Sequence, residues 1–440
     1  MPKNKIGVIA AMAVALGAII GAGIFVLSGT VIAIAGPYAI LAFAIVGLVA
    51  LAVALNFGML GMIMPSAEGA SYSYVYKAFG SEMGFITGIL LYFSFATAVS
   101  VVSLGFGTTL ASVLGSQFSG YGYVFSIALI AAVGLINLRG IRNAAHTDVA
   151  LVIAKIGILL IFVAFAIIFA FSSSQFKLSN FSGSGSGGSI ITDILEASVA
   201  IFFAYTGFQT VSTFTSRIVG GAKAAAKAIT TAVVISIVIY ILVIISLMLL
   251  KPASSFNINS DPLTSALAAA SAPQWLFLLV SIGALIATAS ATIAMVLAAS
   301  HVMYQISKDG LLPKIFRKYN AENDVAFNSV IVSVIIAAVM LFAGNVYIIA
   351  AISNFGLLFS YIMSIIALVH FHKRNKMHGA RPIFYPYLQI ATIIMLMIFM
   401  YGLPQEAFVI NVVIVISLIV VYYTLREVED KRIIRIRLFK

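Results

Sequence analysis

The sequence contains no cysteine, which excludes disulfide bonds and thiolate metal sites and says little about the cellular compartment. Charged residues are scarce as well, at 9% of the 440 residues, whereas soluble globular proteins carry roughly a quarter. Apolar residues reach 62% instead, which is more than a single core can bury. Lipid must therefore be the solvent for much of the apolar surface, and an integral membrane protein is predicted.

The net charge of +12 could suggest nucleic-acid binding, but the placement of the charges argues against it. Basic residues fall in short gaps between long apolar runs, which is the pattern of a membrane protein. The N-terminal apolar run exceeds the core of a signal peptide, so we interpret it as a retained transmembrane helix. The sequence shows no metal-ligand spacing, catalytic triad or phosphate loop, and we predict no enzyme activity, metal or cofactor.

A membrane-spanning helix needs roughly 20 mostly apolar residues. Continuous apolar runs without period-two alternation indicate helices and not a barrel, so the predicted fold is all-α. The third and eighth runs are long enough to require tilt or to project beyond the bilayer. Twelve transmembrane segments are predicted, at residues 7–33, 38–63, 83–115, 121–137, 148–171, 193–215, 225–250, 274–306, 326–345, 346–371, 383–402 and 404–425.

The basic residues also predict the orientation. With the N-terminus in the cytoplasm, 22 of the 25 lysines and arginines fall on the cytoplasmic side, while Lys177 and Lys251 fall outside and Lys155 lies within a helix. This bias predicts a multi-pass protein of the cell membrane with both termini in the cytoplasm. The basic tail after Arg426 lies either on anionic lipid or free in solvent.

Two apolar segments are interrupted by glycine at equivalent places. Gly17, Gly21 and Gly23 lie in the first segment, and Gly207 lies in the sixth. Such paired interruptions are typical of inverted-repeat transporters. An unwound turn frees N–H groups for a carboxylate and C=O groups for an ammonium, and a zwitterionic amino acid needs both. The alternative is that these glycines only permit close helix packing.

Three motifs carry a family resemblance. Residues 17–25 fit the pattern GxxIGxGIF, residues 202–208 fit FFAYxGF, and residues 299–313 are similar to ASRxxYxxxxDGxLP. Together they resemble permeases of the amino acid–polyamine–organocation superfamily, and in particular prokaryotic proton-coupled amino acid transporters. The resemblance implies one domain, 1–440, with a five-plus-five inverted repeat, helices 1 and 6 unwound at mid-membrane, and two added helices. Its parts would be residues 1–171, 193–371, 383–425 and the tail 426–440.

The sequence departs from this family at several positions. The usual acidic residue after Phe208 is Gln209, and the usual arginine near the end of helix eight is His301. The acidic pair and Asn-Pro that usually end helix six are replaced by Ser216-Arg217 and Gly220-Gly221. These changes put ion pairs of an inner gate in doubt, and we expect them to leave the unwound segments unaffected.

The family pattern implies a substrate site made mainly of backbone. It assigns the substrate carboxylate to the N–H groups around Ala22 and Gly23, and it makes Phe203 an aromatic gate on the outer side. An apolar lining with little charge favours a neutral amino acid. The substrate ammonium would bind the carbonyls of Ile19, Phe203, Ala204 and Thr206.

Two ionisable residues inside predicted helices are candidates for proton coupling. A central lysine costs roughly 2.5–3.5 kcal/mol in a membrane helix, so Lys155 is conspicuous unless it snorkels to the cytoplasmic interface. The resemblance implies that a lysine here replaces the sodium ion of sodium-coupled relatives and ties helix five to helix one. Glu196 is a weaker candidate, because an acid near a helix start can simply favour the dipole.

The resulting prediction is a secondary transporter that imports neutral amino acids by proton symport, with alternating access. The partners are then an amino acid, a proton and the bilayer, without nucleic acid. The alternatives are a sodium-coupled or exchange permease for amino acids, polyamines or other organic cations. A channel or a scaffold that does not transport is more remote, because no pore ring or selectivity filter is visible.

Overall fold

The computed structural model describes residues 7–21, 23–64, 71–139, 144–172, 177–182, 189–212, 218–258, 261–320, 325–374 and 384–438. This part of the chain is almost entirely helical, as the apolar runs predict. It departs from the all-α prediction in one small antiparallel pair, β1 (Tyr319–Asn320) with β2 (Val325–Ala326).

The helices follow the predicted order of apolar segments. The first half of the chain holds α1 (Val8–Ile19), α2 (Gly23–Val26), α3 (Ser28–Ala35), α4 (Ala39–Ile63), α5 (Ser71–Phe79), α6 (Ser81–Leu114), α7 (Gly122–Arg139) and α8 (Ala144–Ser172). The second half holds α9 (Ile190–Phe202), α10 (Gln209–Ser212), α11 (Gly221–Leu250), α12 (Pro262–Ala269), α13 (Gln274–Lys308), α14 (Phe327–Met340), α15 (Val346–Lys373), α16 (Tyr387–Tyr401) and α17 (Gln405–Leu438).

Nine stretches of the described residues are long and apolar enough to cross a membrane. The predicted third and eighth segments become α6 and α13, with 34 and 35 residues, which confirms their unusual length. The predicted sixth, ninth and eleventh segments coincide with the shorter helices α9, α14 and α16, of 13, 14 and 15 residues. The protein is thus a multi-pass helical membrane protein.

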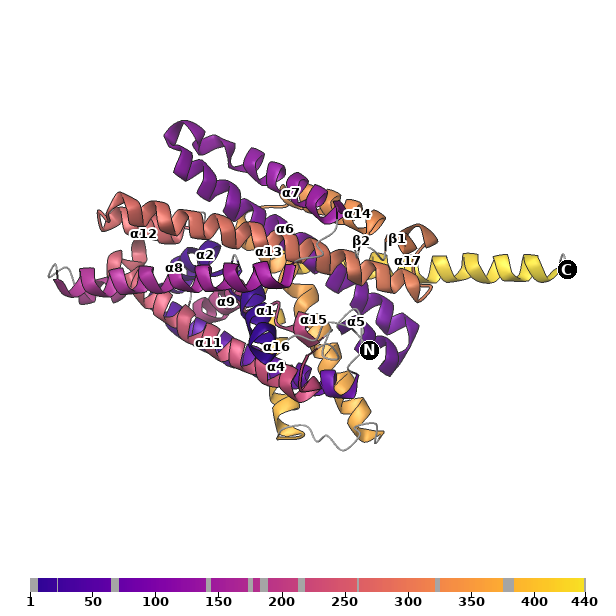
Figure 1. Cartoon of the computed structure of the whole chain (residues 1–440). Helices are drawn as coiled ribbons and strands as arrows, with labels where there is room; N and C mark the ends of the chain where they lie inside the picture. The colour runs from indigo at the N-terminus through magenta and orange to yellow at the C-terminus, as the bar shows by residue number, and fades with distance from the viewer. Residues whose placement is uncertain are drawn as a thin grey trace.

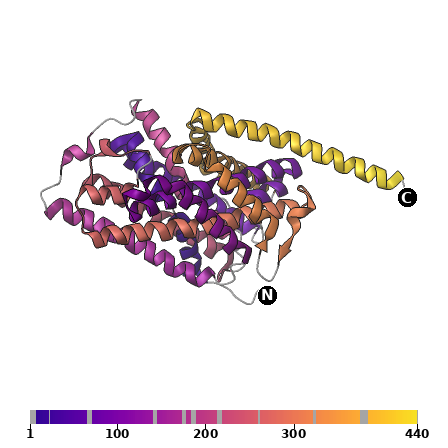
Figure 2. The same ribbon diagram turned by 90° about the horizontal axis from the view of Figure 1, so that it is seen from above.

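Helix α6 lies at the centre of the bundle and α17 at its edge. The apolar window of α6 is 89% buried and that of α17 is 17% buried. Helices α13, α15 and α7 pack around α6, and α11 packs against α4 and α1. The apolar side chains that α17 leaves exposed, such as Val420 and Ile416, suit a lipid-facing surface. Both views show α17 continuing as one helix away from the bundle (Figures 1 and 2).

The stretch between the predicted second and third segments, residues 64–82, contains a helix that the sequence did not predict. In α5, the buried Tyr72 donates a hydrogen bond of 2.7 Å to Asp309 Oδ2 at the end of α13. Burial raises the pKa of Tyr72 above its ordinary value, so the phenol keeps its proton and remains the donor. This contact ties α5 to the end of α13.

Candidate functional site

The first predicted segment is broken where its glycines indicate. Helix α1 ends at Ile19, and Ile20 has φ −78° and ψ 61°, close to an inverse γ-turn. The N–H of Gly21 donates to the carbonyl of Ile19 at 2.7 Å, which closes that turn. Helix α2 begins at Gly23 and continues toward α3 through a bond from Leu27 N–H to the Gly23 carbonyl. Ala22, which we predicted to bind the carboxylate, lies outside the described residues.

The sixth predicted segment is broken as well. Helix α9 ends at Phe202, a 3-10 turn covers Phe203–Tyr205, and Thr206 is extended with φ −85° and ψ 169°. Gly207 has φ +105°, a conformation that side chains with a Cβ rarely adopt. The helix is therefore interrupted at Gly207, and the backbone geometry explains why glycine is favoured there.

The two breaks touch each other at two points. A Cβ built on Gly23 would lie 2.4 Å from the Cβ and 2.5 Å from the Cα of Ala204. A Cβ on Gly207 would lie 2.8 Å from the carbonyl oxygen of Ala18. Glycine thus serves close approach at both positions, and the second break contacts residues on either side of the first, Ala18 and Gly23. Both glycines therefore lie at breaks in helices and also permit close packing.

Two carbonyls that we predicted to bind the substrate ammonium face the same point. The hydroxyl of Tyr240, on α11, lies 2.7 Å from the carbonyl oxygen of Ile19 and 3.0 Å from that of Ala204. A third predicted carbonyl, that of Phe203, accepts hydrogen bonds from the hydroxyl of Thr206 at 2.7 Å and from its N–H at 3.2 Å. The structure thus adds Tyr240 to the site, a residue that the sequence did not single out.

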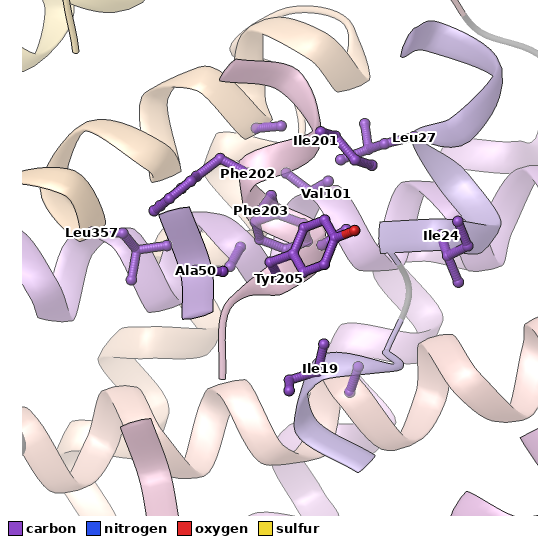
Figure 3. Packing of buried hydrophobic residues seen from close by; sticks show 14 of the residues in the cluster. Ile19, Ile24, Leu27, Ala50, Val101, Ile201, Phe202, Phe203, Tyr205 and Leu357 are labelled. Atoms are coloured by element: carbon purple, nitrogen blue, oxygen red, sulfur yellow. The ribbon is translucent and has the colours of Figure 1, made fainter. Parts of the chain in front are cut away.

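The predicted pocket residues are buried together. Ile19, Phe203, Ala204 and Thr206 are each exposed by 5% or less. Figure 3 shows Phe203 and Tyr205 on the turn that forms the second break, with Ile19 and Ile24 on one side. On the other side of the same turn, Phe202 points toward Leu357 (Figure 3).

Gln209 corrects one expectation from the sequence, that the departures from the family leave the unwound segments unaffected. Its Oε1 accepts a hydrogen bond from the N–H of Gly207 at 2.9 Å and another from the hydroxyl of Tyr361 at 2.8 Å. Tyr361 lies on α15, and its ring contacts Phe202 before the break and Phe208 after it. An amide oxygen therefore holds the break at the position where the family usually places a carboxylate.

Lys155 lies on the interior face of α8, with 2% of its surface exposed. Val152, three residues earlier, fills the space beside Gly17 of α1. A Cβ built on Gly17 would lie 2.6 Å from Val152 Cγ2. Ile158, three residues later, fills the space beside Gly283 of α13. A Cβ built on Gly283 would lie 2.8 Å from Ile158 Cδ1. Residues three apart share a helix face, so Lys155 lies on the seam between α1 and α13. Such burial does not fit snorkelling to an interface.

Glu196 lies farther into its helix than the sequence suggested. Helix α9 begins at Ile190, and the side chain of Ser189 caps it by accepting from the N–H of Thr192 at 3.3 Å. Glu196 is then the seventh residue of the helix. A helix dipole acts on charges in the first turn, and Glu196 lies beyond that turn. A simple helix-start role is therefore disfavoured for this half-buried carboxyl.

Comparison with known proteins agrees with the motifs. The model of a family described as amino acid permease matches residues 6–425. A methylthioribose transporter of Bacillus subtilis is 27% identical over 88% of this chain and 86% of its own length. A branched-chain amino acid permease of Lactococcus lactis is 29% identical over 76% of this chain and 75% of its own. A mitochondrial cationic amino acid transporter of Arabidopsis thaliana is 25% identical over 81% of this chain and 60% of its own length.

Proposed function

The chain belongs to the amino acid permease family, and we propose that it imports neutral amino acids by proton symport with alternating access. The observation that carries the proposal is the contact between the two broken helices. Their carbonyls at Ile19 and Ala204 face one hydroxyl, that of Tyr240. An ammonium group has three donors and binds such converging carbonyls well.

The carboxylate of the substrate would bind at the start of the half-helix formed by α2 and α3. The N–H of Gly23 lies at its first residue, and the chain continues helically with Val31 N–H bonded to the Leu27 carbonyl. The positive end of a half-helix favours an anion. A neutral substrate is favoured because the residues described around the two breaks carry no charge: Ile19, Gly23, Phe203, Ala204, Thr206 and Tyr240.

The arrangement of the helices supports a five-plus-five repeat with two further helices. The first and sixth predicted segments are both broken, and each break contributes to the same site. We infer twelve crossings, a cell-membrane location and both termini in the cytoplasm, since 22 of the 25 lysines and arginines then lie on the cytoplasmic side.

Lys155 is the proposed proton-coupling residue, with Glu196 as the second candidate. Its burial between α1 and α13 puts an ammonium where a change of charge acts on the helix that ends at the first break. A proton can shift a transporter only through its differential affinity for the two gate states. A lysine buried beside α1 in one gate state and more exposed in the other would have this differential affinity.

Uptake into proteoliposomes tests the proposal directly. We expect labelled leucine to accumulate when the outside is more acidic, and we expect arginine and methylthioribose to compete weakly. Gly157→Ala serves as the control variant, because a Cβ at Gly157 meets no atom within 4 Å. Accumulation that is driven by sodium and shows no pH effect would favour the sodium-coupled alternative over proton symport. Accumulation that occurs only when amino acid is trapped inside the vesicles would favour exchange.

A further inference from the structure

A short helix rests on the half-helix that follows the first break. Helix α12 packs against α2 and α3 as well as α11 and α13, and Figure 1 shows it beside one end of α13. The hydroxyl of Thr30, on α3, donates to the carbonyl of Ile258 at 2.8 Å, just before α12. Leu263 and Ala266 are buried. Helix α12 is therefore docked on the element that would bind the substrate carboxylate.

The residue that precedes α12, Asp261, has its carboxyl enclosed by this docking. The carboxyl interacts with the hydroxyls of Thr264 on α12 and of Thr109 near the end of α6, and with the backbone N–H of Thr264. Its Oδ2 is buried and has no hydrogen-bond partner among the described groups. An ionised carboxylate enclosed in this way is destabilised, because the described residues leave its Oδ2 without a donor to replace water.

Among the described residues, no charged or titratable group of the neighbouring elements acts on the pKa of this carboxyl. Helices α2 and α3 contain none, and Lys251, after α11, lies over the ring of Phe256 at 4.9 Å. Burial is the largest influence, and it raises the pKa of Asp261 to about 6 against the opposing effect of the two hydroxyls and of the Thr264 N–H. The titratable groups of the other packed helices lie toward their middles or opposite ends: Glu82 and Tyr92 on α6, Lys223, Lys227 and Tyr240 on α11, and His301, Tyr304 and Lys308 on α13.

We propose that Asp261 is a proton-binding site, separate from Lys155, that controls the docking of α12 on the half-helix α2–α3. The neutral carboxyl stays enclosed, whereas the ionised carboxylate favours a state in which α12 has moved away and water reaches the charge. Docking is thus strengthened by acid on the side of the membrane where α12 lies.

The size of the effect follows from the difference between the docked and the solvated carboxyl. The docked group binds its proton at a pKa of about 6 and the solvated group near the ordinary value of 3.8. The docked form is therefore weakened as the pH rises through this window. Between pH 7.5 and pH 5 the ratio of docked to undocked protein should rise about tenfold.

The absence of cysteine allows a direct measurement of docking. Ala266→Cys places a thiol at a position with 0% exposure, and Ala269→Cys places one on the exposed face of the same helix. The protein is held in nanodiscs, so a thiosulfonate reagent reaches both faces. The ratio of the two modification rates cancels the effect of pH on thiol reactivity. We expect the modification rate of Ala266→Cys, divided by that of Ala269→Cys, to fall about tenfold from pH 7.5 to pH 5.

Asp261→Asn keeps the shape of the side chain and cannot ionise. In that background the ratio should stay at its low, docked value at both pH values, and Asp261→Ser should behave in the same way should the amide variant not fold. A ratio that does not change with pH in the protein with Asp261 would overturn the proposal, and so would a change that persists in both variants. Neither outcome depends on substrate or on transport.

Discussion

The contact between the two broken helices can be tested by adding a single methyl group at Gly23. The added Cβ would lie 2.4 Å from Ala204 Cβ and 2.5 Å from Ala204 Cα, whereas carbon atoms in contact are about 3.5–4.0 Å apart. The groups that must yield are backbone and a Cβ fixed to it, not the end of a flexible side chain. The two unwound segments must therefore separate by about 1 Å.

That separation reaches the carbonyls of the proposed ammonium site. The hydroxyl of Tyr240 bridges Ile19 and Ala204 at 2.7 and 3.0 Å, and a shift of 1 Å takes one of these bonds beyond hydrogen-bond range. A misplacement of this size costs about a hundredfold where geometry determines function. We expect Gly23→Ala to raise the dissociation constant for leucine by about this factor and to destabilise the fold by about 1–3 kcal/mol.

A series of glycine variants makes the test graded. Gly157→Ala adds a methyl group that meets no atom within 4 Å, whereas at Gly21 it meets Ala291 Cβ at 3.2 Å. Equilibrium binding of labelled leucine to purified protein should therefore weaken in the order Gly157→Ala, Gly21→Ala, Gly23→Ala. Equal affinity for the Gly157 and Gly23 variants, with both folded, would refute the reasoning.

Three further predictions concern Tyr240, Lys155 and the orientation. Tyr240→Phe removes the hydroxyl that bonds to the buried carbonyl of Ala204 and should destabilise the protein by about 1–3 kcal/mol. The measurement is the melting temperature, which should fall. An unchanged melting temperature would show that this hydrogen bond contributes little to stability. Lys155→Ala should abolish pH-driven uptake and leave substrate binding, which rests on backbone groups; retained uptake with the same pH dependence would transfer the coupling role to Glu196. A cysteine at Ser184, in the loop after the fifth predicted segment, should be labelled by an impermeant reagent from outside, and labelling only from the cytoplasm would contradict the orientation.

Glycine was the most informative residue type for predicting the site from sequence. A glycine cluster in an apolar run marks either unwinding or close packing, and here the structure shows both at Gly23 and Gly207. The order of the apolar runs likewise predicted the order of the helices, because lipid leaves few alternatives to a helix. These features are local, so one stretch of sequence contains the information.

The residues that hold the breaks in place could not be predicted in this way. Tyr240 bonds to a carbonyl 221 residues away, and Tyr361 bonds to a side chain 152 residues away. Within its own helix each reads as one aromatic residue in an apolar run, which is equally typical of packing. Gln209 was noticed only as a departure from a pattern, and its role depends on where Tyr361 lies. Such roles follow from tertiary contacts that periodicity does not encode.

The position of Lys155 shows how a proton could act on a site built from backbone. Val152 and Ile158 fit against Gly17 and Gly283, so α8 is held in register with both α1 and α13 by contacts one turn on either side of Lys155. Gly17 lies within one turn of the end of α1, where the first break begins. A change of charge at Lys155 would therefore act on the end of α1, and through it on the carbonyl of Ile19.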